Sequence, residues 1–383
     1  MAAHLQARRR TLKQLAGAAA ASLATPMWAQ SAGKPIVLGQ SAPFSGPAAQ
    51  LGEQFKRGAL LYFNQLNAKG GVNGRGIELK SLDDGYEPDR CKANTEKLIK
   101  DGVFALFGYI GTPTSLAALP LATAAQVPFI APFTGAQALR DPFNRFAFHV
   151  RASYFDETAE IVKQVTSIGS KRVAVFHQND SYGKAGLDGV VRALKALNLE
   201  PAALGTVERN TVDVAAAVKT IVAAKPDAIV QISAYKSCAA FIREARKAGY
   251  GGSFYNVSFV GTKALADELG ADARGVVVSQ VMPYPYSPAM PISAEYLAAG
   301  KAVEADNFAP NYSSIEGFVA AKTLAEALKR MTGAAGAEAL IVALESLREH
   351  NLGGFFVDFG ANKHMGSRFV DLTILTAEGK VRR

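Results

Sequence analysis

Cysteine and histidine are scarce in this sequence. Its 383 residues include two cysteines, Cys91 and Cys238, and five scattered histidines. Two cysteines exclude a disulfide scaffold and a cysteine-based zinc cluster. The histidines offer no close pair of metal ligands. We therefore expect no metal centre and no bound cofactor.

Long apolar runs and catalytic motifs are also missing. After residue 29, no uncharged apolar stretch reaches the length of about 18 residues that a membrane-spanning helix needs. We therefore expect that the mature chain is not membrane-embedded. The sequence has no phosphate-binding P-loop, no G-x-S-x-G elbow and no H-E-x-x-H motif. Nothing in it predicts an enzyme.

Positive charge is in modest excess and unevenly placed. The chain has 42 lysines and arginines against 33 acidic residues, which gives a formal net charge of +9. Four of the basic residues, Arg8, Arg9, Arg10 and Lys13, lie in residues 1–29, which contain no acidic residue. No basic run interleaved with aromatic residues follows, so we expect no nucleic-acid binding.

Residues 1–29 have the organisation of an export signal. A basic start leads into a short run of Leu, Ala and Gly, and the small residue Ala29 precedes a polar break. The paired arginines are typical of a twin-arginine signal, but the aromatic residue that usually follows them is missing, so general secretion stays open. A basic tail without a targeting role is the other interpretation. We expect cleavage near Ala29 and a mature protein in the periplasm of a Gram-negative bacterium.

From residue 36 onward, short apolar runs alternate with amphipathic stretches. The pattern predicts strands at residues 35–39, 77–82 and 104–107 with helices between them, and a second series of the same kind begins near residue 152. Repeated β-α-β units of this length predict parallel sheets with helices on both faces. We therefore expect an α/β protein made of two doubly wound parallel-sheet lobes.

Two polar loops follow neighbouring predicted strands. Residues 107–115 combine a glycine turn with Thr112 and other hydroxyl residues at the start of a predicted helix, and residues 131–136 contain Thr134. In doubly wound folds, ligands bind outside the carboxyl ends of strands, and the free N–H groups at a helix start attract a carboxylate. The alternative is that one of these hydroxyls only caps its own helix. The residue types leave both interpretations open.

Several short motifs occur in a specific order along the chain. They are Gly39-Gln40-Ser41-Ala42-Pro43-Phe44-Ser45-Gly46-Pro47, Asn67-Ala68-Lys69-Gly70-Gly71-Val72-Asn73-Gly74, Asp83-Asp84, Val127-Pro128-Phe129-Ile130-Ala131-Pro132, Asp180-Ser181-Tyr182-Gly183 and Ala245-Arg246-Lys247-Ala248-Gly249. Together they resemble the periplasmic solute-binding proteins of the leucine/isoleucine/valine-binding type, which serve ABC importers. The resemblance covers nearly all of the mature chain.

The resemblance implies two lobes joined by three crossovers, with the ligand cleft between them and closure by a hinge motion. We expect a first lobe formed by residues 30–150 and 282–355 and a second lobe formed by residues 151–281 and 356–383. The expected partners are a small carboxylated ligand and an inner-membrane ABC permease, and the protein is expected to be a monomer. A sensor subunit for a membrane receptor is the alternative role. An exported enzyme on the same scaffold ranks third.

The resemblance also implies ligand contacts in the first lobe. The ligand carboxylate is expected at Thr112, with further contacts at Thr134 and Gly135. A glycine at position 135 replaces the usual hydroxyl residue, so Thr134 is expected to take over its role.

Further contacts follow from the same resemblance. Tyr182 and Tyr235 correspond to second-lobe tyrosines that close over the ligand. Leu51 replaces an aromatic residue that often lines the side-chain pocket. The candidates for flat apolar walls are Phe44, Tyr109, Phe133 and Tyr312, although each is at least as well suited to a core position.

Two departures from the family pattern affect the site. Ser258 stands where amino-acid-binding members carry the acidic residue that pairs with the ligand's ammonium group, and an ammonium buried without a counter-charge is costly. We therefore expect a ligand with a carboxylate but no α-ammonium, such as an aromatic, aliphatic or keto acid. Arg151, at the expected first crossover, is a candidate either to pair with the ligand carboxylate or to order the hinge.

The second departure concerns cysteine. The family's cysteine pair near the cleft is missing, because Tyr86 and Gly111 occupy those positions. Cys91 and Cys238 are predicted on helices of different lobes, where a bridge between them would lock the hinge. We therefore expect two free, buried thiols.

Overall fold

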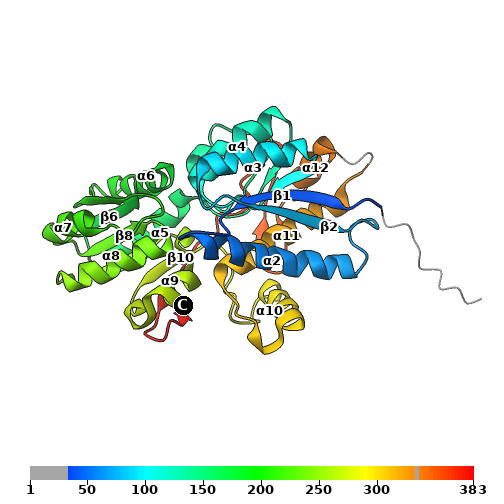
Figure 1. Cartoon of the computed structure of the whole chain (residues 1–383). Coiled ribbons are helices and arrows are strands. Elements are labelled where there is room, and N and C mark those ends of the chain that lie inside the picture. Colours follow the sequence, from blue (N-terminus) through cyan, green and yellow to red (C-terminus); the bar gives the residue numbers. More distant parts are fainter. Residues whose placement is uncertain (1–32, 333–335) are drawn as a thin grey trace, which may run out of the picture.

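A computed structural model describes residues 33–332 and 336–383 of the chain. Two lobes lie side by side, one mostly green and one mostly blue and orange in Figure 1, and each is built on its own β-sheet. Helices pack on both sheets, so the expected α/β class with two parallel-sheet lobes is confirmed. The export signal expected at residues 1–29 lies outside the described residues.

The first sheet has the strand order β2-β1-β3-β4-β5, with parallel pairing between each pair of neighbours. Its strands are β1 (Ile36–Ala42), β2 (Ile77–Asp83), β3 (Ala105–Phe107), β4 (Phe129–Ile130) and β5 (Ala147–Phe148). The elements between them are α2 (Ala49–Ala68), α3 (Pro88–Lys100), α4 (Thr112–Ala124) and the short 3-10 helix η1 (Gln137–Leu139). Because β3 and β4 are neighbours, the two polar loops that follow them open on the same sheet edge.

The second sheet has the order β14-β13-β10-β9-β8-β6-β7. Its strands are β6 (Val173–Gln178), β7 (Leu204–Val207), β8 (Ala228–Ile232), β9 (Ser253–Asn256), β10 (Val277–Gln280), β13 (Asp371–Leu375) and β14 (Val381–Arg382). The last two pair antiparallel, β13 with β10 and β14 with β13. This antiparallel edge differs from the purely parallel sheet expected from the sequence, because the final crossover brings the chain back beside β10 in the reverse direction.

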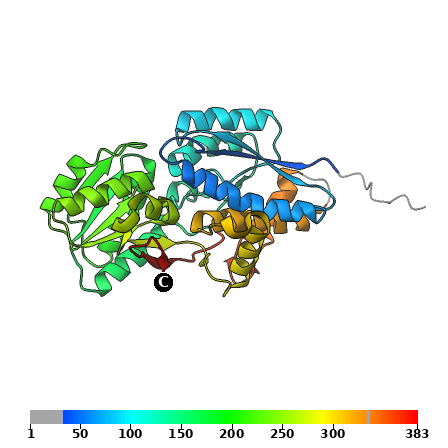
Figure 2. The ribbon, with the colours of Figure 1, turned by 60° about the horizontal axis from the view of Figure 1, so that its bottom comes forward.

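Helices of the second lobe cover both faces of its sheet. They are α5 (Tyr154–Ser167), α6 (Ser181–Lys195), α7 (Ala215–Ala223), α8 (Tyr235–Lys247) and α9 (Thr262–Leu269), with the 3-10 helices η2 (Ser258–Val260) and η3 (Gly270–Ala273) after β9 and α9. Between β10 and β13 the chain returns to the first lobe as α10 (Pro291–Glu304), η4 (Ala305–Asn307), α11 (Tyr312–Arg330), α12 (Ala337–Glu345), β11 (His350–Asn351) and β12 (Phe356–Val357). Figure 2 shows α10 and α11 beside α2.

The chain crosses between the lobes three times, from β5 to α5, from β10 to α10 and from β12 to β13. The first and third crossovers run alongside each other. The amide N of His149 donates to the carbonyl O of His364 at 2.8 Å, and the amide N of Gly366 donates to the carbonyl O of His149 at 2.7 Å. These paired segments form part of the hinge between the lobes.

Local sequence signals explain how α5 begins directly after the first crossover. Ser153 is the N-cap residue, and its side chain accepts from the amide N of Asp156 while the Asp156 side chain accepts from the amide N of Ser153. This reciprocal capping box satisfies two of the unpaired N–H groups at the helix start. Arg151 lies two residues before this N-cap.

Cys91 on α3 and Cys238 on α8 are both buried and unbridged, which confirms the expected free thiols. In residues 33–332 and 336–383, no helix combines the length and the apolar character that a membrane crossing requires.

Helices α2 and α11 pack with their backbones in close contact. A Cβ atom added to Gly58 of α2 would lie 1.7 Å from the carbonyl O of Ser314, and one added to Gly317 of α11 would lie 2.0 Å from the carbonyl O of Phe55. Only glycine permits this approach, so the packing of the C-terminal helices onto the first lobe depends on these two positions.

We expect Gly58→Ala to lower the free energy of unfolding by about 1–3 kcal/mol, because the added methyl group forces two helix backbones apart. Chemical denaturation followed by circular dichroism measures this change. The control is Gly251→Ala, where an added Cβ meets no atom within 4 Å. Equal stability of the two variants would contradict the close packing.

Candidate functional site between the lobes

Five aromatic side chains meet where the two lobes face each other, and we call them the interlobe aromatic cluster. They are Tyr86 and Phe133 of the first lobe and Tyr154, Tyr182 and Phe259 of the second, each at most 1% exposed. The ring centroid of Phe259 lies 4.5 Å from that of Tyr182, 5.6 Å from Phe133 and 5.9 Å from Tyr86. Tyr154 lies 5.5 Å from Tyr182. The lobes are therefore in direct contact through a buried aromatic surface.

Two members of this cluster, Tyr154 and Phe259, were not predicted as site residues from the sequence. Phe259 is the one that a sequence rule could have indicated. It follows Ser258 in η2, beyond the carboxyl end of β9. The rule that ligands bind at the carboxyl ends of parallel strands would have pointed to this loop. Its ring direction, toward the first lobe, depends on the packing of the two lobes.

The two expected hydroxyl residues of the first lobe lie together. The Oγ1 atoms of Thr112 and Thr134 are 2.6 Å apart, and both side chains are fully buried. The N-cap of α4 is Gly111, to which no side-chain cap hydrogen bond is made, and the Thr114 hydroxyl donates back to the Gly111 carbonyl at 3.1 Å. The capping interpretation is therefore wrong for these hydroxyls.

Glycine at position 135 has a steric cause. The amide N of Tyr154 donates to the Gly135 carbonyl at 2.7 Å, and a Cβ atom on Gly135 would lie 2.6 Å from that same amide N. A larger residue would collide with the start of α5. The glycine at this position thus permits the close approach of the Thr134 loop to the second lobe.

Arg140 connects the loop that contains Thr134 to the first crossover by hydrogen bonds. Its side chain is buried, and its Nη2 atom lies 3.1 Å from the Thr134 carbonyl O and 3.3 Å from the Ala152 carbonyl O, to both of which it donates. Burial, and then the positive charge of Arg151, lower the pKa of Arg140 to about 10. The guanidinium therefore keeps its charge at neutral pH and holds two backbone carbonyls in place.

Arg151 is the charged centre of the site. Its side chain is 1% exposed, and its guanidinium carbon lies 4.7 Å from the centroid of the Phe133 ring. Nη2 donates to the Ser258 hydroxyl. Two carboxylates are also near, with Glu157 at 3.5 Å from Nη2 and Glu316 at 3.6 Å from Nη1.

Glu157 is almost fully engaged by the second lobe. Its carboxylate accepts from the amide N of Ser258 at 2.7 Å, from the Ser258 hydroxyl at 3.0 Å and from the Ser279 hydroxyl at 2.6 Å. Burial holds the pKa of Glu157 above its usual value, against the lowering effect of Arg151 and of these hydrogen bonds. The Ser258 hydroxyl accepts from Arg151 and donates to Glu157, so it belongs to a closed polar network.

Glu316, on α11, is the less engaged carboxyl group. It is 5% exposed, and its distance of 3.6 Å from Arg151 is an ion-pair distance too long for a hydrogen bond. Burial raises the pKa of Glu316 to about 7, against the lowering effect of Arg151. This carboxyl group therefore changes protonation near neutral pH.

The expected second-lobe tyrosines both lie at the lobe contact. The Tyr182 hydroxyl donates to the Ser233 carbonyl at 3.5 Å, and its ring belongs to the interlobe aromatic cluster. Tyr235 begins α8, and its hydroxyl approaches the backbone of Gln50 in α2 of the other lobe.

Leu51 also reaches across to the second lobe. A Cβ atom built on Gly261, directly after η2, would lie 2.4 Å from the Leu51 Cδ2 atom. Leu51 is fully buried. It therefore lies at the boundary between α2 and the second lobe.

The structure does not bring Phe44 and Tyr109 to the interlobe aromatic cluster. Tyr109 turns back into the first lobe, where its hydroxyl lies 3.1 Å from the Thr95 Oγ1 atom and its ring packs 4.9 Å from that of Phe129. Phe44 is half-buried in the loop after β1, with Lys56 4.8 Å from its ring centroid. Tyr109 therefore has the core role that the sequence left open.

Tyr86 and Gly111, the positions without the family's cysteines, are in contact. A Cβ atom on Gly111 would lie 2.2 Å from Cε2 of Tyr86, and both residues have positive φ, 99° and 65°. Gln178 of the second lobe donates to the Tyr86 hydroxyl at 3.4 Å. Nearby, Arg209 pairs with Glu87 at 2.9 Å. This edge of the cleft is therefore closed by contacts between the lobes.

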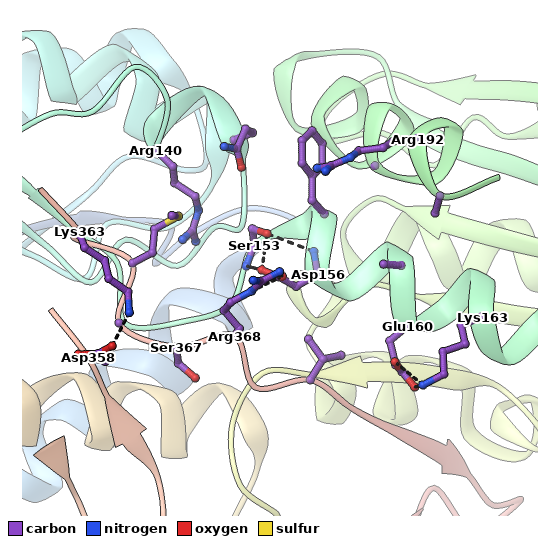
Figure 3. A pocket seen from close by; sticks show the side chains of 18 of the residues that line it. Arg140, Ser153, Asp156, Glu160, Lys163, Arg192, Asp358, Lys363, Ser367 and Arg368 are labelled. Carbon is purple, nitrogen blue, oxygen red and sulfur yellow. Dashed lines mark hydrogen bonds and ion pairs between the residues drawn. The ribbon is translucent and has the colours of Figure 1, made fainter. Parts of the chain in front are cut away.

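A separate groove of about 1410 Å³ lies beside the first and third crossovers (Figure 3). Ser153, Asp156 and Arg368 line it, and Arg368 donates from Nε to Asp156 at 3.0 Å. Its lining includes no member of the interlobe aromatic cluster. Arg140 lines this groove and also holds the Thr134 loop, so it lies between the two regions.

Among the residues that the structure describes, no three His, Cys, Asp or Glu side chains are grouped so as to hold a metal ion. The polar groups around Arg151 are its own guanidinium, the Ser258 hydroxyl and the two buried carboxyl groups of Glu157 and Glu316. Such a set suits hydrogen bonding and charge pairing with a small polar organic molecule.

Two doubly wound lobes, three crossovers and polar groups at the facing strand ends define a class of two-lobed binding proteins that enclose a small ligand. The chain belongs to the periplasmic binding protein family, whose model matches residues 35–379.

Among curated relatives, a Leu/Ile/Val-binding protein, BraC3, of Rhizobium johnstonii is 26% identical over 348 residues, which cover 88% of this chain and 90% of the relative. Among solved structures, a possible leucine/isoleucine/valine-binding protein from Rhodopirellula baltica has a TM-score of 0.87 at 33% identity, covering 92% of this chain and 96% of that one. A substrate-binding periplasmic protein from Ralstonia solanacearum has a TM-score of 0.85, also at 33% identity, covering 90% of this chain and 99% of that one.

The raised pKa of Glu316 predicts a pH effect on stability. A carboxyl group whose pKa is about 7 when folded and 4.5 otherwise holds its proton more tightly in the native state, so its contribution to stability is lost as the pH rises from about 4.5 to about 7. We expect Glu316→Gln to reduce this loss, measured as the change in unfolding free energy between about pH 5 and about pH 7.5.

The matched control is Glu326→Gln on the same helix, since Glu326 lies at the surface with a side chain 24% exposed. An equal decline of the unfolding free energy with rising pH in the wild type and in Glu316→Gln would show that Glu316 is ionised in the folded protein throughout this range.

Proposed function

We propose that the protein is the periplasmic binding component of an ABC importer and captures a small carboxylate that lacks an α-ammonium group. Family membership and the printed names of relatives, which include Leu/Ile/Val-binding and amino acid binding proteins, support a role in solute capture. The basic, apolar start of the chain supports export to the periplasm. An inner-membrane permease is the partner that this role requires.

The observation that carries the choice of ligand is the network around Ser258. At this point the nearest charge is the Arg151 guanidinium, and the Glu157 carboxylate behind it already accepts three hydrogen bonds. An ammonium group placed here would meet a cation. Of the two buried carboxyl groups near that cation, Glu157 has its oxygens engaged and Glu316 lies at the other amino group of the guanidinium, Nη1. Because an unpaired buried charge costs several kcal/mol, such a ligand is disfavoured relative to an acid without the ammonium group.

In this proposal the ligand carboxylate binds at the start of α4. The hydroxyls of Thr112 and Thr134 lie 2.6 Å apart there, and the helix N-terminus favours negative charge. Closure then places Tyr182 and Tyr235 of the second lobe over the ligand, with Leu51 at its apolar side. The closed state is favoured by a ligand only to the extent that the ligand makes additional contacts in it.

A thermal-shift screen of the purified protein tests the ligand class. The panel contains branched amino acids, aromatic acids, aliphatic mono- and diacids, keto acids and amides. A ligand at about 100 times its Kd stabilises the folded state by about 2.7 kcal/mol, which gives a measurable rise in Tm. We expect the largest shifts from acids without an α-ammonium group. Shifts from amino acids alone would contradict the proposal and would require another residue to neutralise the ammonium.

Thr112→Val tests the carboxylate position. We expect Kd for the best acid of the screen to rise about fivefold to tenfold, because one hydrogen bond is lost at nearly constant side-chain volume. Isothermal titration calorimetry measures Kd, and thermal melting shows whether the variant stays folded. The control is Thr123→Val on the same helix, whose hydroxyl donates to the Leu119 carbonyl away from the lobe contact. An unchanged Kd for Thr112→Val would place the carboxylate elsewhere.

A further inference from the structure

The guanidinium of Arg151 has hydrogen-bonding capacity that the described residues leave unused. Its Nη2 atom donates to Ser258, but within residues 33–332 and 336–383 neither Nε nor Nη1 has a hydrogen-bond partner. The side chain is 1% exposed, so bulk water does not replace the missing acceptors. Leaving buried donors of a charged group unpaired costs free energy.

The geometry limits how an acceptor can reach this guanidinium. The Phe133 ring covers one of its faces, with 4.7 Å between the guanidinium carbon and the ring centroid. The Nη2 corner is occupied by Ser258 and Glu157. An acceptor must therefore approach the Nε and Nη1 atoms. The Glu316 carboxylate lies 3.6 Å from Nη1, which is too far for a hydrogen bond.

The same guanidinium lies close to the proposed carboxylate position. Phe133, under Arg151, directly precedes Thr134, whose hydroxyl is paired with that of Thr112. The Thr134 hydroxyl also donates to the Tyr154 hydroxyl at 3.4 Å. Tyr154 in turn lies close enough to Arg151 for the guanidinium charge to oppose the rise in its pKa that burial causes. A ligand whose carboxylate binds the two threonines would present the atom next to that carboxylate to Arg151.

We propose that Arg151 determines specificity by donating to an acceptor on the carbon next to the ligand's carboxylate, so that the preferred ligands are 2-oxo acids. This inference rests on the proposed function, and it narrows the expected acids to those with an oxygen acceptor at the second carbon. An unsubstituted acid leaves the Arg151 donors unpaired, and a 2-amino acid presents a cation to them. The surrounding rings of Phe133, Tyr182 and Phe259 suit a flat or branched apolar side chain.

Two matched ligand sets test the inference by isothermal titration calorimetry. One set is phenylpyruvate, 3-phenylpropanoate and phenylalanine, and the other is 4-methyl-2-oxopentanoate, 4-methylpentanoate and leucine. Within each set only the substituent at the second carbon changes. We expect the 2-oxo acid of at least one set to bind about tenfold to a hundredfold more tightly than the unsubstituted acid, the range expected for a hydrogen bond to a charged donor.

Removing Arg151 alone would leave two buried carboxyl groups without their counter-charge, and such a variant is at risk of not folding. The double variant Arg151→Gln with Glu316→Gln removes one positive and one negative group together. In this variant we expect the Kd of the unsubstituted acid divided by the Kd of the 2-oxo acid to fall to near one. The unsubstituted acid should keep its wild-type Kd within a few fold. Glu316→Gln alone shows how much of any change comes from the carboxyl group. The control that should keep the 2-oxo preference is Glu326→Gln on the same helix, because Glu326 pairs with Lys329 at 2.8 Å.

Arg151→Lys provides a second route if the double variant does not fold. Lysine keeps the charge but lacks the planar fork of donors, so we expect it to lower the 2-oxo preference as well. An unchanged preference in either folded variant would overturn the assignment to Arg151.

The outcomes separate this inference from the proposed function. Equal binding of 2-oxo and unsubstituted acids by the wild type would overturn the role of Arg151 and leave the carboxylate proposal standing. Tightest binding of the amino acids would overturn both. A wild-type protein that binds none of the acids but binds the corresponding amides would likewise overturn both.

Discussion

The buried charge of Arg151 is the constraint on which the centre of this molecule depends. A guanidinium this far from solvent has to be balanced, and Glu157 of the second lobe and Glu316 of the first lie 3.5 Å and 3.6 Å from it. Arg151 itself lies on the first crossover. The charge balance thus joins the hinge to an element of each lobe, and the same three groups form the polar side of the candidate site.

The contacts that join the lobes are also the contacts that surround the candidate ligand. Phe259 of the second lobe packs against Phe133 and Tyr86 of the first, and Arg140 holds the Thr134 carbonyl and the crossover at once. A molecule bound between the lobes would therefore touch groups whose positions depend on the hinge. In the proposed function, this arrangement links occupancy of the site to the relative position of the lobes.

Much of the fold follows from local sequence signals. The alternation of apolar runs and amphipathic stretches predicts the two α/β lobes, and neighbouring β3 and β4 bring Thr112 and Thr134 to one sheet edge. The same reasoning fails for Tyr109, because the end of a strand does not determine whether a side chain turns toward the other lobe or toward α3. The Tyr109 hydroxyl lies 3.1 Å from the Thr95 hydroxyl of α3. It also fails for the antiparallel β13, whose direction depends on the path of the last crossover.

The sequence by itself determined the fold class, the serine at position 258 and the glycine at position 135. Each of these is a property of residue types and of their order along the chain. Only the tertiary structure decided what those positions touch: Ser258 lies between Arg151 and Glu157, and Gly135 lies against the start of α5. These partners come from distant parts of the chain, and the packing of one lobe on the other sets the direction of each side chain.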